Sequence, residues 1–207
     1  MTMAERASAA LSDPPAVIAT LSVPGAAQMR LFGSRLARLL RRGDLVVLAG
    51  SLGAGKTTLV QGIGAGLGVR GPVTSPTFVI ARVHPSAGQG PDLVHADAYR
   101  LGSRLEVDDL DLDADLDHAV TVVEWGEGLV EDLAQGHLRI TIDRPAPEPD
   151  FPADAPAVPG PNGTSHASGG LDGDTGDQVR TVTLAGYGRR WAAAAGRLRS
   201  VLSEPPS

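Results

Sequence analysis

Short apolar runs recur along the chain and predict the strands of a sheet. They are residues 17–22, 45–49, 93–100, 119–123, 137–143 and 179–185. The runs at 45–49 (LVVLA) and 119–123 (AVTVV) are almost free of polar residues. Such runs are typical of strands that are covered on both faces, as in a parallel sheet.

Other stretches have helical spacing instead: residues 24–43, 57–67 and 189–202. In the first of them Pro24 stands at the start, and Phe32, Leu36 and Leu40 are four residues apart on one face. We expect this helix to end near Gly43. Helices alternating with strands predict an α/β, three-layer fold with a mostly parallel central sheet and antiparallel strands late in the chain.

The net charge of −6 arises in one segment. Residues 145–177 hold six acidic residues and no Lys or Arg, which leaves 18 acidic and 18 basic residues elsewhere. The segment also holds seven Pro and six Gly, so it cannot bury enough apolar surface to offset the entropy of ordering. We predict one domain over residues 16–203, interrupted by this disordered insertion, with a disordered extension at 1–15 and a tail at 204–207.

Composition excludes several classes of protein. Without cysteine the chain can form no disulfide, thiolate zinc site or iron–sulfur cluster. No apolar run is long enough to span a membrane, and the first fifteen residues lack the pattern of a secretory signal, so we expect a cytoplasmic protein. Aromatic residues make up only 3%, too few for a surface that stacks the bases of single-stranded nucleic acid.

The clearest chemical signal is the sequence GSLGAGKTT. Its residues are Gly50, Ser51, Leu52, Gly53, Ala54, Gly55, Lys56, Thr57 and Thr58, and Lys56 is the only lysine among 18 basic residues. The first eight satisfy G-x-x-x-x-G-K-[ST] between a predicted strand and a predicted helix, which is the order that a phosphate-binding loop requires. The fold is therefore expected to be P-loop NTPase-like. Lys56 would reach the β- and γ-phosphates of a nucleotide, and the Thr57 hydroxyl would hold Mg²⁺.

A magnesium site also needs a carboxylate at the end of a neighbouring strand. Glu124 ends the apolar run at 119–123 and is one candidate. Asp97 is the other, because residues 93–100 alternate so that His95, Asp97 and Tyr99 would share one face. The pattern leaves open whether Glu124 or Asp97 holds the metal, and whether His95 is functional or simply buried in the core.

Four motifs together resemble the TsaE (YjeE) family, the small ATPase of bacterial threonylcarbamoyladenosine tRNA modification. They are GSLGAGKTT at 50–58, SPTF at 75–78, HADAYR at 95–100 and EW at 124–125. The resemblance runs from about residue 21 to residue 143 and resumes near residue 179. The chain departs from the usual family pattern in its insertion, in its extension and in Gly126, where proline is common.

The resemblance implies that residues 50–58 bind the phosphates of ATP, and that Thr77, in a switch-like loop, also belongs to the ATP-binding residues. It implies that Thr57 and Glu124 bind Mg²⁺ and that Lys56, Asp97 and Glu124 form the catalytic set. Residues contacting the adenine are placed only within 22–28.

The resemblance also implies partners. The family acts with TsaD and TsaB proteins on adenosine 37 of tRNAs that read codons beginning with A, and ATP hydrolysis resets that complex. We expect tRNA to be reached through the complex rather than by a basic patch of this chain, because the bulk charge favours neither sign of partner.

Other phosphate-loop proteins remain as alternatives. A small-molecule kinase would share the loop, but no arginine-bearing lid is recognisable. A regulatory GTPase needs an N-K-x-D motif, which a chain with Lys56 as its only lysine cannot contain. A transporter-type ATPase would need an intact L-S-G-G-Q, and an ATP-gated binding module without useful turnover is the non-enzymatic alternative. An apparent calcium loop at 109–120 fails, because Ala114 and Val120 occupy its glycine and glutamate positions.

Overall fold

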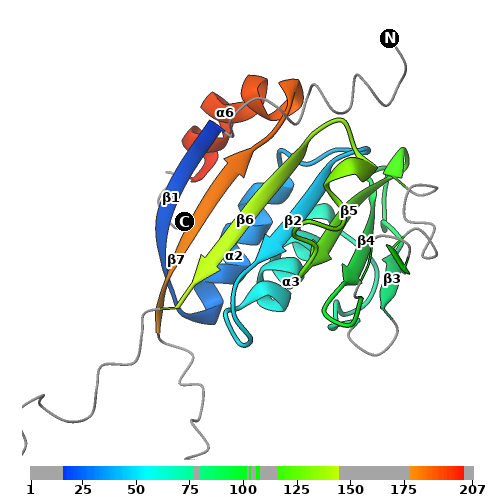
Figure 1. The fold of residues 1–207 in the computed structure, drawn as a ribbon, viewed down its shortest axis with the longest axis horizontal. Helices are drawn as coiled ribbons and strands as arrows, with labels where there is room; N and C mark the ends of the chain where they lie inside the picture. The colour runs from blue at the N-terminus through cyan, green and yellow to red at the C-terminus, as the bar shows by residue number, and fades with distance from the viewer. Residues whose placement is uncertain are drawn as a thin grey trace, which may run out of the picture.

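A computed structural model describes residues 16–76, 80–101, 103, 106–107, 116–144 and 178–202. Its strands form one sheet in the order β1-β7-β6-β2-β5-β4-β3 (Figure 1). Their bounds are β1 Ala16–Pro24, β2 Leu45–Ala49, β3 Ala81–His84, β4 Asp92–Asp97, β5 Ala119–Glu124, β6 His137–Asp143 and β7 Val179–Gly186. The α/β class is confirmed, and each predicted run coincides with a strand, except that the run at 93–100 extends beyond the end of β4 at Asp97. The edge strand β3 was not predicted.

The centre of the sheet is parallel and its margins are antiparallel. Strands β6, β2, β5 and β4 run in the same direction, whereas β7 and β1 on one side and β3 on the other run against their neighbours. Every residue of β2 and β5 is buried, as expected of strands covered on both faces. The carboxyl ends of the parallel strands therefore meet at one edge of the sheet, which we call the carboxyl edge.

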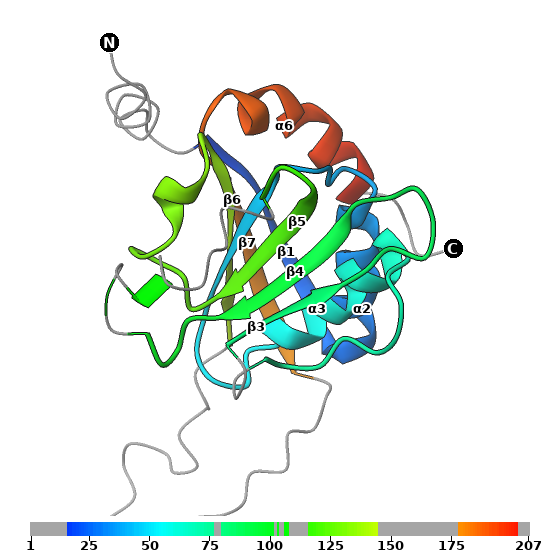
Figure 2. The ribbon, with the colours of Figure 1, turned by 90° about the vertical axis from the view of Figure 1, so that its right-hand side faces the viewer.

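One face of the sheet carries the helices α2 (Gly25–Ala37), α3 (Lys56–Leu67) and α6 (Arg189–Leu202) (Figure 2). Met29, Leu36, Ile63 and Trp191 from these helices are fully buried in the larger core cluster. The other face is covered by a smaller cluster, to which Val107, Leu116 and Val130 contribute from the connecting segments. These segments include the short 3₁₀ helix η1, Glu131–Leu133.

Helices α2 and α3 pack closely because glycines lie at their contact. A Cβ atom on Gly33 would meet the Leu59 carbonyl oxygen, and one on Gly62 would overlap the backbone of Arg30. Neither position has room for a side chain. This close packing fixes α3 against the core, and the phosphate-loop motif leads directly into α3.

Helix α2 ends earlier than the sequence predicted. Its last residue is Ala37 rather than one near Gly43, because Arg38, Leu39 and Leu40 donate their N–H groups to carbonyls three residues back. These bonds tighten the chain into turns, although Leu40 stays buried as its spacing suggested. The predicted extension, insertion and tail (residues 1–15, 145–177 and 204–207) lie outside the described residues, so the domain boundaries stay a prediction.

Candidate functional site

The GSLGAGKTT segment forms the connection between β2 and α3. Gly50 has φ +134° and Gly55 has φ +110°, conformations that residues with a side chain rarely adopt. A Cβ on Gly50 would also collide with the carbonyl oxygen of Ile142 in β6. The loop therefore needs glycine at both positions, and it delivers the chain to the N-terminus of α3, where unpaired N–H groups favour an anion.

Arg180 supports this loop from β7. Its side chain is buried, and its Nε donates a hydrogen bond to the Ala54 carbonyl at 2.9 Å. Sequence reasoning missed this residue. The signal was present, because Arg180 alternates with Val182 and Leu184 on the buried face of the strand, where a cation requires a partner.

Lys56 folds back onto the loop. Its Nζ donates to the carbonyl oxygens of Gly50 (2.8 Å) and Ser51 (3.0 Å) and lies 3.8 Å from the ring centroid of Trp125. Burial lowers the pKa of Lys56, and the negative charges of Glu124 and Asp97 oppose this shift. The structure thus holds a poorly hydrated cation over the loop, where a phosphate would be attracted.

Trp125 covers Lys56 through an unusual backbone. Its φ of +60° is rare for a residue with a large side chain, and its N–H donates to the Leu48 carbonyl of β2 at 3.0 Å. Its ring contacts Tyr99 at a centroid distance of 5.3 Å. Tyr99 lies beyond the end of β4 and is 63% exposed, so it does not share the buried face predicted for it with His95 and Asp97.

Glu124 connects the neighbouring strands to the start of α3. Its Oε1 accepts a hydrogen bond from the Thr57 hydroxyl at 2.8 Å and lies 2.9 Å from His95 Nε2. Glu124 and His95 are both buried. A carboxylate and a hydroxyl in direct contact at the N-terminus of a helix are the oxygen donors that Mg²⁺ prefers.

Asp97 lies beside Glu124 because the two residues pair in the register of β4 and β5. It is buried, and its Oδ1 accepts the Tyr99 backbone N–H at 3.0 Å. That turn ends β4 at Asp97. The carboxyl edge thus places two carboxylates within the electrostatic reach of Lys56.

The remaining predicted residues divide into three groups. Ser51, Leu52 and Gly53 are exposed at the tip of the loop, and Leu52 is 82% exposed. Ala54 is buried, and Thr58 is half-buried in the first turn of α3. Thr77 lies outside the described residues.

Among the described residues, no group of three or more His, Asp or Glu side chains is arranged to hold a metal ion by itself. Mg²⁺ commonly takes only one or two protein oxygens and completes its shell with phosphates and water. The donor set of Thr57 and Glu124 fits such an ion, and the glycine cradle at Gly50 and Gly55 fits a phosphate chain.

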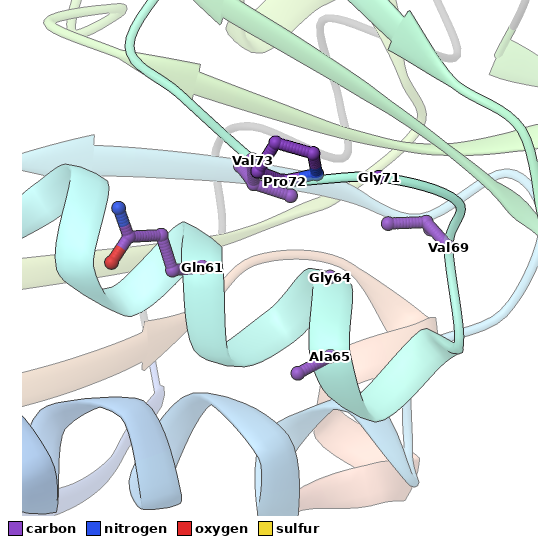
Figure 3. A pocket seen from close by; sticks show the side chains of 7 residues that line it. All are labelled: Gln61, Gly64, Ala65, Val69, Gly71, Pro72 and Val73. Carbon is purple, nitrogen blue, oxygen red and sulfur yellow. The ribbon is translucent and has the colours of Figure 1, made fainter.

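One cleft lies away from this site. It has a volume of about 310 Å³ and lies between the C-terminal half of α3 and the segment that carries Val69 and Val73 (Figure 3). A smaller cleft of about 110 Å³ includes Ser22 and Gln28 from the segment predicted to approach the adenine. Neither cleft is lined by residues of the phosphate loop.

Comparison with known proteins identifies the family. The protein-family model described as "Threonylcarbamoyl adenosine biosynthesis protein TsaE" matches residues 23–148, more than half of the chain. The chain belongs to the TsaE family. Its role therefore lies in tRNA threonylcarbamoyladenosine biosynthesis, and its fold is P-loop-like.

Individual relatives agree with this assignment. The tRNA threonylcarbamoyladenosine biosynthesis protein TsaE of Streptomyces coelicolor is 58% identical over 167 residues, which cover 80% of this chain and 95% of the relative. The protein of the same name from Mycobacterium tuberculosis is 50% identical over 132 residues, 60% of this chain and 79% of its own. A crystal structure of Bacillus subtilis YdiB superimposes with a TM-score of 0.61 at 25% identity, covering 91% of this chain and 98% of YdiB.

None of the helices in the described residues is both long and apolar enough to cross a bilayer.

Proposed function

We propose that this TsaE protein is a Mg²⁺-dependent ATPase that serves threonylcarbamoyladenosine formation at position 37 of tRNAs reading codons that begin with A. The observation that carries the proposal is the 2.8 Å hydrogen bond from the Thr57 hydroxyl to Glu124, at the end of a glycine loop that also presents Lys56. This arrangement supports a site for a metal-bound nucleoside triphosphate.

Each part of the site has a proposed task. Residues 50–58 hold the phosphates through backbone N–H groups and the partial positive charge at the start of α3. Lys56 exchanges its carbonyl partners in the loop for phosphate oxygens, because these carry more negative charge. Thr57 and Glu124 hold the metal ion, and Thr77 belongs to the ATP-binding set through the family resemblance.

Bound Mg²⁺ neutralises the charge that develops on the phosphoryl group. Asp97, as the neighbour of Glu124 across the strands, orients the attacking water or supports the metal ion. Arg180 contacts the loop, but its Nε donates to the Ala54 carbonyl rather than pointing a free N–H group at the transferred phosphoryl group. We therefore expect the isolated chain to hydrolyse ATP slowly. An arginine that stabilises the transferred phosphoryl group accelerates hydrolysis by about a thousandfold or more.

We therefore propose that partners complete the site. TsaD and TsaB proteins would dock on this chain, stimulate hydrolysis and use it to reset their complex between rounds of modification. The tRNA would reach the reaction through that complex.

A reconstituted reaction tests the proposal. ATP hydrolysis is measured for the purified chain alone and with its cognate TsaD and TsaB, and threonylcarbamoyl transfer to tRNA is followed over many turnovers. We expect weak hydrolysis alone, clear stimulation by the partners, and a single round of tRNA modification when Asp97 or Glu124 is replaced. Multiple turnovers without this protein, or transfer of the phosphoryl group to a small acceptor, would contradict the proposal.

A further inference from the structure

The imidazole of His95 is completely buried beside the proposed metal ligand. Its Nε2 lies 2.9 Å from Glu124 Oε1, the same oxygen that accepts the Thr57 hydroxyl at 2.8 Å. One carboxylate oxygen therefore receives two hydrogen bonds, one from α3 and one from β4. Among the described residues, Glu124 Oε2 has no hydrogen-bond partner.

The distance between the two groups fits a hydrogen bond from the ring to the carboxyl group. A carboxylate can only accept, so an ionised Glu124 requires that His95 Nε2 carries the proton. The other nitrogen, Nδ1, is buried and has no partner among the described residues.

The backbone around His95 is rigid. The residue lies inside β4, where it pairs with Val122 of β5, and Asp97 pairs with Glu124 two positions further along. Leu93 on the same strand is fully buried in the larger core cluster. A side chain held by the middle of a buried strand keeps its orientation better than one on a loop.

His137 is a buried histidine outside this site and offers a comparison. It begins β6 at the opposite edge of the sheet, is 1% exposed, and stacks on the Tyr187 ring at a centroid distance of 4.3 Å. Neither of its ring nitrogens has a partner among the described residues. His95 differs because its ring nitrogen bonds directly to a carboxylate of the site.

We propose that His95 is a positioning residue for Glu124. Its Nε2–H group holds the carboxylate so that Oε1 stays on Thr57 while Oε2 remains for the metal ion. This inference rests on the proposed function of the Thr57 and Glu124 pair. Hydrogen-bond partners of metal ligands typically change metal affinity or activity by about 10- to 100-fold when they are removed.

Matched substitutions separate this role from packing. His95→Gln keeps an N–H group about where Nε2 lies, whereas the amide of His95→Asn is too short to reach Glu124, and His95→Leu has no donor. His137→Gln is the control for replacing a buried histidine. For each variant, the Mg²⁺ concentration that half-saturates ATP hydrolysis, the nucleotide affinity without metal and the melting temperature are measured.

We expect His95→Leu and His95→Asn to raise the half-saturating Mg²⁺ concentration by about 10-fold or more. Nucleotide affinity without metal should stay unchanged, and His95→Gln and His137→Gln should keep the metal dependence of the natural chain. The melting temperatures show which variants fold. If His95→Leu does not fold, the contrast between Gln and Asn decides the matter, and equal metal dependence in these two variants would overturn the proposal.

A measurement without metal or nucleotide completes the test. Nitrogen NMR of the histidine rings should show a proton on His95 Nε2. The opposite tautomer would overturn the inference, because Nε2 could then not donate to Glu124. Lack of hydrolysis by the natural chain, alone and with its partners, would instead contradict the proposed function and leave the NMR result standing.

Discussion

Two buried carboxylates at opposite ends of the parallel strands are used in different ways. Asp44 comes directly before β2, and Glu124 ends β5 at the carboxyl edge; each is 3% exposed. Asp44 Oδ1 accepts Arg190 Nε at 3.0 Å, and its Oδ2 accepts Arg190 Nη2 and the Arg41 N–H, both at 2.9 Å. Glu124 receives its two hydrogen bonds on one oxygen and has no arginine partner among the described residues.

The difference separates a structural carboxylate from one suited to binding. Both oxygens of Asp44 are occupied by a forked guanidinium, which ties α6 to the start of β2. Lys56 is close enough to Glu124 for the carboxylate to affect its pKa, but its ammonium bonds to loop carbonyls instead of to the carboxylate. Among the described residues, the carboxyl edge therefore keeps one carboxylate oxygen, Glu124 Oε2, without a hydrogen-bond partner, whereas both oxygens of Asp44 at the opposite edge have one.

The largest effect should follow from breaking the ion pair between Asp44 and Arg190. Asp44→Ala leaves the Arg190 guanidinium without its buried partner, so the free energy of unfolding should fall by about 3–5 kcal/mol. Urea unfolding measures this change, and the double variant Asp44→Ala/Arg190→Ala should lose less than the sum of the single losses. A loss below about 1 kcal/mol would mean that the pair contributes no more than an exposed ion pair.

The next effect concerns Lys56, the cation of the phosphate loop. Lys56→Ala should lower ATP hydrolysis by about 100- to 1,000-fold, because the phosphates lose their main charged donor. Lys56→Arg should be almost as damaging, since a planar guanidinium does not replace a compact ammonium in this loop. Hydrolysis assays and thermal melts of both variants check this, and the melts should show no loss of stability. Full activity in Lys56→Arg would contradict the expectation.

A smaller loss is expected at the carboxylate itself. Glu124→Gln keeps an oxygen that can accept from Thr57 and His95 but loses the negative charge, so Mg²⁺ dependence should shift by about 10- to 100-fold. Nucleotide affinity should change much less, because the glycine loop survives. Titration of Mg²⁺ against the rate of hydrolysis measures the shift. An unchanged titration would transfer the metal role to Asp97, its register neighbour.

The smallest effect is a pH dependence at the opposite edge. Burial lowers the pKa of His137 below its ordinary 6.5, against the effect of Glu131, so the folded state binds its proton less readily than the unfolded state. Stability from this residue is present above pH 6.5 and is lost as the pH falls through the folded pKa. Unfolding free energies between pH 7.5 and about 5 should therefore fall less steeply in His137→Gln. The slope should be reduced rather than removed, because burial also lowers the pKa of His84.

The sequence by itself determined most of the elements and the phosphate loop. Strands β2 and β6 and helix α6 have the predicted bounds, and α3 begins one residue earlier than predicted. These segments are readable because their hydrophobic spacing reports local geometry, and because the loop motif is contiguous in sequence. The end of α2 and the edge strand β3 were not readable, since bonds to carbonyls three residues back and pairing with β4 leave no strong periodic signal.

The tertiary structure alone decided which distant side chains meet. Arg180 contacts the loop across 126 positions, Thr57 contacts Glu124 across 67, and His95 contacts Glu124 across 29. The residues themselves can be read from the sequence, but their contacts depend on the register of β4 with β5 and on the strand order that brings β7 near the loop. Hydrophobic patterns specify which face of a strand is buried, whereas the partner of a buried polar group is determined only when the strands have paired.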